Sequence, residues 1–65
     1  DLSEFDWSER METALELLTE KQRLVIELKY MEGYKQCEIA KLMGVSSAAV
    51  KKHLDKAEAI IREHY

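Results

Sequence analysis

Residues 36–54, QCEIAKLMGVSSAAVKKHL, decide the fold of this chain because they join two helical patterns through a single glycine. The first pattern covers about residues 35–43 and stops at Gly44, which can adopt positive φ because it has no Cβ. Ser46 is a good N-cap for a second helix over residues 47–63. Two helices joined by a turn of about three or four residues that contains glycine are typical of a helix-turn-helix.

The apolar residues of both helices predict a shared core. The second helix carries them at spacings of four, three and four, which places on one face Val50, Leu54, Ala57 and Ile61. The shorter helix offers as inward candidates Ile39, Ala40, Leu42 and Met43, and Val45 follows the turn as a hydrophobic plug. In a helix-turn-helix the second helix enters the major groove of DNA, with its N-terminal residues at the base edges. An αα-hairpin that only packs its two helices together is the structural alternative.

A helix over about residues 6–18 is predicted at the start of the chain. Asp6 with Glu9 three residues later fits a capping box, and Phe5 before the cap fits a hydrophobic staple. Apolar residues recur at helical spacing along this segment: Trp7, Met11, Ala14, Leu15 and Leu18.

A second capping box, formed by Thr19 and Gln22, starts another helix directly afterwards. Its inward candidates are Val25, Ile26, Leu28 and Tyr30. This helix is expected to end near Met31, because Gly33 supplies the left-handed residue that follows many helix ends. The sequence therefore predicts an all-α fold with four helices, in which an N-terminal helix joins a three-helix core.

The composition excludes several classes of protein. A chain of 65 residues that is 46% hydrophobic and lacks proline suits one small helical domain. Its single cysteine, Cys37, excludes an internal disulfide, and two histidines with one cysteine are a poor zinc set. No apolar run approaches the roughly 20 residues of a membrane span. There is no Gly-rich phosphate loop and no supported Ser-His-Asp set, so we expect no enzyme activity. We also expect no cofactor, no metal and no membrane contact. The single cysteine and the lack of a signal peptide favour a cytoplasmic location.

Charge is divided unevenly along the chain, although the net charge is only −3. Residues 1–20 hold seven acidic side chains and one arginine, whereas residues 21–65 hold nine basic and six acidic ones. Binding to phosphate depends on the face that the protein presents rather than on the average charge. The second helix of the motif presents Lys51, Lys52 and Lys56 on its polar side, which favours a nucleic-acid partner.

The run from Leu17 to Glu63 resembles region four of bacterial sigma factors, the part that meets the −35 promoter element, and METALELL before it resembles the opening helix of that region. The ending KYMEG, residues 29–33, is similar to the sigma-type pattern. The LuxR-type response-regulator domain is the alternative, because it shares a Leu-Thr opening and a Val-Lys-x-His string, here Val50, Lys51 and His53. The LuxR pattern is typically one residue shorter between Leu18 and Gly33.

The resemblance implies that the early recognition-helix positions are Ser47, Ala48, Lys51 and Lys52, with Lys56 a turn further on. Sigma factors often place Arg or Glu at the first two of these positions. Serine and alanine make weaker contacts to bases, so we expect modest DNA binding in which lysines contact phosphates. His53 can donate a hydrogen bond, and Lys35 with Gln36 opens the shorter helix, whose first-turn N–H groups can hold a phosphate. The full candidate set for DNA contact is Lys35, Gln36, Ser46, Ser47, Ala48, Lys51, Lys52, His53 and Lys56.

The expected partners are double-stranded DNA and, through the resemblance, a subunit of RNA polymerase or an anti-sigma-like regulator. A protein-interaction module that docks on such a partner stays open as an alternative function. The first twenty residues are acidic, and no arginine stands at the early recognition-helix positions that contact bases. A weak homodimer also stays open. We expect residues 1–65 to form a single domain, the C-terminal part of a longer protein.

Overall fold

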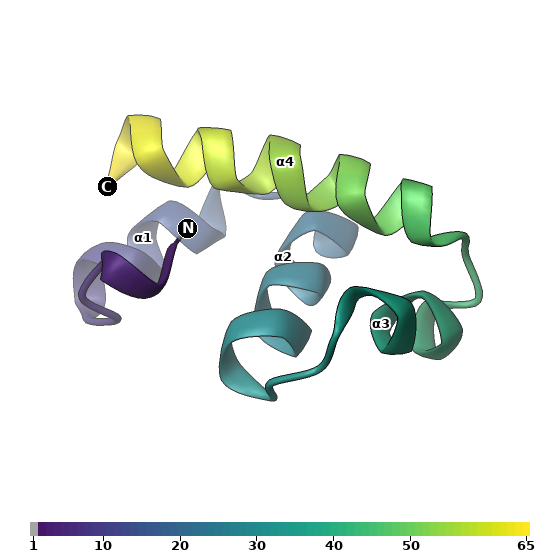
Figure 1. The fold of residues 1–65 in the computed structure, drawn as a ribbon. Helices are drawn as coiled ribbons and strands as arrows, with labels where there is room; N and C mark the ends of the chain where they lie inside the picture. The colour runs from purple at the N-terminus through teal and green to yellow at the C-terminus, as the bar shows by residue number, and fades with distance from the viewer. Residues whose placement is uncertain (1) are drawn as a thin grey trace.

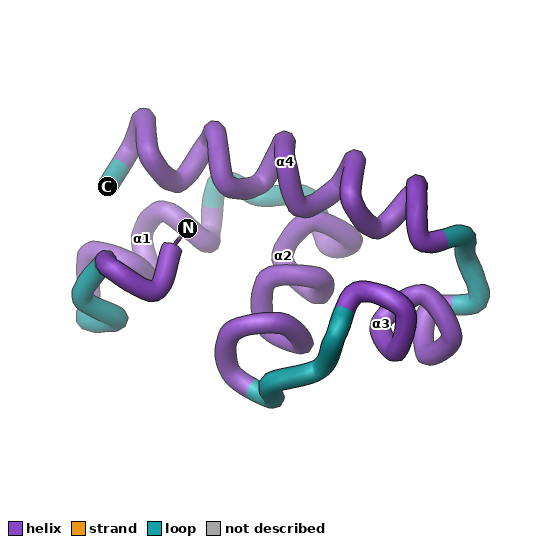
Figure 2. Tube along the Cα trace, in the orientation of Figure 1, coloured by secondary structure: helices purple, strands orange, loops and turns teal. Residues whose placement is uncertain are grey.

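The computed structural model describes residues 2–65, and within this range the chain forms helices and no strands (Figures 1 and 2). The elements in chain order are the 3-10 helix η1 (Leu2–Glu4), α1 (Glu9–Glu16), α2 (Glu20–Ile26), η2 (Glu27–Met31), α3 (Gln36–Met43) and α4 (Ser47–His64). The predicted all-α class with four α-helices is confirmed.

Helix α4 is the element on which the others are assembled. It runs the length of the molecule, with α1 beneath its C-terminal half, α2 beneath its middle and α3 beneath its N-terminal end (Figure 1). Its predicted stripe is buried in full, and the four residues are Val50, Leu54, Ala57 and Ile61. They meet Met11, Ala14, Leu15, Val25, Ile26, Ile39 and Ala40 in one hydrophobic cluster. Because three helices pack on one stripe, the orientation of α4 is fixed by the core.

The turn between α3 and α4 has the geometry that the sequence predicts. Gly44 is left-handed, with φ of 69°, and the N–H of Val45 donates to the carbonyl of Ala40 at 3.0 Å. The hydroxyl of Ser46 accepts from the N–H of Ala49 at 3.2 Å and caps α4. These bonds satisfy main-chain groups that helix ends would otherwise leave unpaired.

The boundaries of the second helix are also confirmed. Thr19 and Gln22 exchange both bonds of the capping box, at 3.1 and 3.2 Å. After Ile26 the helix continues as η2, a π-helix in which the N–H of Glu32 reaches the carbonyl of Glu27 at 3.1 Å. Gly33 then ends it with φ of 78°.

The predicted start of the first helix is wrong. Helix α1 begins at Glu9 with Ser8 as its N-cap, so the proposed capping box between Asp6 and Glu9 does not form. Tertiary contacts hold the preceding residues instead: the Tyr65 hydroxyl donates to the carbonyl of Asp6 at 2.8 Å, and the rings of Phe5 and Tyr65 lie 4.7 Å apart. Packing on the C-terminal end of α4 therefore outweighs the local signal for a helix.

The predicted burial of Leu42 is wrong as well, since 59% of its side chain is exposed. Helix α3 turns Ile39 and Ala40 to the core and Met43 to its edge. At about 100° per residue, Leu42 lies well off that face. The other inward candidates outside the core cluster, Trp7, Leu18, Leu28, Tyr30 and Val45, pack half-buried against it.

Tyr30 joins three parts of the fold. Its hydroxyl donates to the Glu58 carboxylate at 3.1 Å and accepts from the N–H of Leu2 at 3.4 Å, and its ring lies 5.6 Å from that of Trp7. Glu58 is also 3.8 Å from both Lys29 and Arg62. Burial raises the pKa of Tyr30 above its ordinary value of 10. The uncharged phenol is therefore the form that the fold stabilises.

Replacing Gly44 by valine should lower the free energy of unfolding by about 1–3 kcal/mol, because a β-branched residue is strained at positive φ. No neighbouring atom lies within 4 Å of a Cβ added there, so the cost comes from the backbone alone. Thermal or urea unfolding measures it. Gly44→Asn is the matched control and should cost less, since asparagine tolerates this conformation. A Gly44→Val variant as stable as the wild type would contradict the assigned turn.

Tyr30→Phe should lower stability by about 1 kcal/mol, the usual loss for one hydrogen bond. The variant should also lose less stability than the wild type as the pH rises into the alkaline range. Because the folded-state pKa of Tyr30 is raised, its contribution is complete below about pH 10 and is lost as the pH rises through the folded-state pKa. Melting curves between neutral and strongly alkaline pH measure both effects. Tyr34→Phe, at an exposed tyrosine, is the control and should leave the neutral-pH melting temperature unchanged.

Candidate nucleic-acid interface

The first ten residues of α4 present three exposed lysines, called the lysine row below. Lys51, Lys52 and Lys56 all lie outside the buried stripe: Lys52 and Lys56 are one turn apart, and Lys51 lies about 100° around the helix from Val50. Among the residues that the structure describes, no carboxylate lies within ion-pair distance of their ammonium groups. Asp55 is exposed in the same stretch and reduces the local positive charge. The three lysines can thus meet phosphate oxygens without first breaking an internal ion pair.

The first turn of α4 lies beside the first turn of α3. The amide Nε2 of Gln36 donates to the main-chain oxygen of Ser47 at 2.9 Å, across eleven residues of sequence. This bond is a contact that the sequence analysis missed, because it depends on the angle at which two helices cross. Gln36 therefore fixes the start of α4 as well as being a candidate DNA contact.

The small residues at the tip of α4 divide into two roles. Ser46 uses its hydroxyl oxygen as the N-cap, whereas Ser47 and Ala48 are exposed in the first turn with no recorded side-chain bond among the described residues. His53 is only half-exposed, on the flank of the lysine row. The structure thus groups Gln36, Ser47, Ala48, Lys51 and Lys52 at one end, with Lys56 one turn further and His53 at the side.

The N-terminus of α3 is less open to an anion than the sequence suggests. The Glu38 carboxylate accepts from the main-chain N–H of Lys35 at 3.0 Å. This places a negative charge at the helix end where a phosphate was expected, and like charges repel. Lys35 itself is exposed and remains a candidate for longer-range attraction.

Within residues 2–65 no three His, Cys, Asp or Glu side chains come together in a way that could hold a metal ion, and Cys37 is a free, exposed thiol. None of the described helices combines the length and the apolar character needed to cross a bilayer.

Comparison with known proteins gives the family. The profile of the family described as Sigma-70, region 4 matches residues 8–61. A UPF0122 protein of Oceanobacillus iheyensis is 41% identical over 49 residues, which cover 75% of this chain and 47% of that protein. A UPF0122 protein of Streptococcus gordonii is 42% identical over 48 residues, covering 74% of this chain and 44% of that protein.

A third relative is named as a sigma factor. The "probable RNA polymerase sigma factor RfaY" of Xanthomonas campestris is 37% identical over 57 residues, which cover 83% of this chain but 14% of that protein. The chain thus spans less than half the length of each of these relatives. No solved structure matches it.

The family match covers all of α1 to α3 and most of α4, including the turn at Gly44 and the lysine row. It confirms the sigma-type interpretation of the sequence in preference to the LuxR-type alternative. By its fold, its helix-turn-helix and this match, the chain belongs to the Sigma-70 region 4 family.

Proposed function

We propose that this chain is a DNA-binding module of transcription that places α4 in the major groove of a promoter element. The observation that carries the proposal is the exposed lysine row Lys51, Lys52 and Lys56 on the second helix of a helix-turn-helix. Family membership supports a DNA-binding domain rather than an enzyme. The ammonium groups would neutralise phosphates and release counterions, which supplies most of the affinity of such domains.

The tip of α4 would read bases only weakly. Ser47 and Ala48 offer one hydroxyl and one methyl group, whereas a bidentate arginine–guanine pair contributes about 1–3 kcal/mol of discrimination. A methyl group suits contact with the C5-methyl of thymine. We therefore expect affinity to come from phosphate contacts and sequence preference to be modest. The remaining specificity would come from a larger assembly that holds the domain at its site.

RNA polymerase is the assembly that the family favours, and one relative is named as a sigma factor of that enzyme. The acidic first helix, with Glu9, Glu12 and Glu16 exposed, offers a protein-binding surface at the far end from the lysine row. An anti-sigma-like regulator could use the same surface. We place the module in the cytoplasm with these partners.

Replacing both Lys51 and Lys52 by alanine should weaken binding to duplex DNA and leave the fold intact, because both side chains are exposed. With about three phosphate contacts, the slope of log K against log salt should be roughly −3, and losing two lysines should reduce it by about 2. Fluorescence anisotropy with a labelled duplex across a salt series measures both quantities.

The matched control for this pair is Lys21→Ala with Arg23→Ala, which removes the same charge from α2. It should keep the wild-type salt slope. A wild-type chain without binding at low salt, or equal losses in both double variants, would contradict the assignment of the interface to α4.

Gln36→Met should weaken DNA binding several-fold with little change in melting temperature. Methionine keeps the length of the side chain but cannot donate to the Ser47 oxygen, so the first turn of α4 should become more mobile. Amide hydrogen exchange at Ala49 and Val50, whose N–H groups donate to Ser46, should speed up in the free protein. Gln36→Ala should behave alike, while Cys37→Ala, at the next exposed position, should change neither measurement. Unchanged exchange in Gln36→Met would show that the hydrogen bond does not position the helix.

A further inference from the structure

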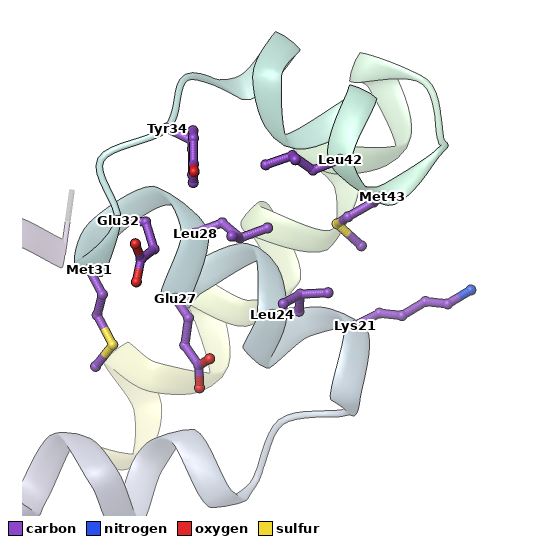
Figure 3. Close-up of a pocket in the computed structure, with 9 residues that line it drawn as sticks. All are labelled: Lys21, Leu24, Glu27, Leu28, Met31, Glu32, Tyr34, Leu42 and Met43. Carbon is purple, nitrogen blue, oxygen red and sulfur yellow. The ribbon is translucent and has the colours of Figure 1, made fainter.

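An apolar groove lies between the second helix and α3, on a surface that shares no residue with the candidate DNA interface (Figure 3). Its volume is about 580 Å³. The lining residues are Lys21, Leu24, Glu27, Leu28, Met31, Glu32, Tyr34, Leu42 and Met43.

The groove gathers most of the large apolar side chains that the described surface exposes. The exposed fractions are 42% for Leu24, 59% for Met31, 38% for Tyr34 and 59% for Leu42. Scattered apolar residues are normal on a surface, but a contiguous group marks an interaction site. Leu24, Leu28 and Met31 also follow one another at spacings of four and three, the pattern of a helix that packs against another helix.

The two ends of the groove carry opposite charges. Lys21 extends from one end, and Glu27 and Glu32 stand at the other, beside Met31 (Figure 3). Glu27 is held by Arg23 at 3.0 Å, whereas the described ion pairs include neither Lys21 nor Glu32. Lys21 and Glu32 are eleven positions apart along the chain, a distance of roughly 16 Å at the rise of an α-helix. The groove is therefore an apolar strip with a positive end and a negative end.

We infer that this groove is the contact surface for a second copy of the same chain. A strip with opposite charges at its ends matches itself when a two-fold axis passes through its centre, because each contact then occurs twice. Antiparallel packing of the two strips sets Lys21 of each copy beside Glu32 of its partner. The same operation brings Leu24 near the partner's Leu28 and covers Leu42. A contact limited to one strip of a 65-residue chain forms a weak dimer rather than an obligate one.

The inference does not rest on DNA binding, so the test is done without DNA. Sedimentation equilibrium of the chain from micromolar to millimolar concentration should show a monomer that converts to a dimer as concentration rises. Leu42→Glu should abolish the dimer, because it places a charge in the apolar strip. Leu17→Glu is the matched control: Leu17 is 54% exposed and does not line the groove, so this variant should still dimerise.

A charge exchange tests the two-fold arrangement itself. Lys21→Glu should weaken the dimer at least several-fold by setting two carboxylates together, and adding Glu32→Lys should restore it. All of these residues are exposed, and circular dichroism checks that each variant stays folded. A wild-type chain that is monomeric throughout would overturn the inference, as would equal losses in Leu42→Glu and Leu17→Glu. Failure of the charge exchange to restore the dimer, or exclusive binding of a foreign amphipathic peptide in this groove, would overturn it too.

Discussion

The left-handed turn at Gly44 is the constraint on which the rest of the structure depends. With φ of 69°, it reverses the chain so that Val45 bonds back to Ala40 and Ser46 caps the next helix. The stripe of α4 then packs on three other helices, and Gln36 ties the first turns of α3 and α4 together. Each bond is modest by itself, about 1 kcal/mol net. Together they fix the orientation of α4. Because its apolar stripe is buried in the core, its lysines are left on the solvent-exposed surface.

The distribution of charge reconciles an acidic protein with a phosphate-binding face. The acidic α1 lies under the C-terminal half of α4 (Figure 1), whereas the three lysines belong to the first ten residues of α4. At physiological ionic strength charges are screened over about 8 Å. The molecule is 30 Å long, and acidic groups of α1 that lie more than about 8 Å from the lysines weaken the field there only a little. The net charge of −3 therefore describes the whole chain and not the surface that would meet DNA.

Local signals predicted most of the fold. The caps at Thr19 and Ser46, the stop at Gly44 and the α4 stripe follow from neighbours within four residues, and all are confirmed. The errors arose where residues distant in the sequence determine the local structure. The carbonyl of Asp6 bonds to Tyr65, and Asp6 lies outside the helix. Leu42 lies off the narrow face of α3 that packs on the core. The candidate site stays a prediction, for which the structure adds only that its three lysines are exposed. The Gln36–Ser47 bond could not be predicted, because no local pattern gives a crossing angle.

The π-helix η2 widens the end of the second helix. A π-turn holds more residues than an α-turn, so the chain from Ile26 to Gly33 carries one more residue per hydrogen-bonded turn than an α-helix would. The widened turn also sets Tyr30 toward α4 and leaves Met31 at the groove. The same helix end therefore serves the core on one side and the exposed groove on the other.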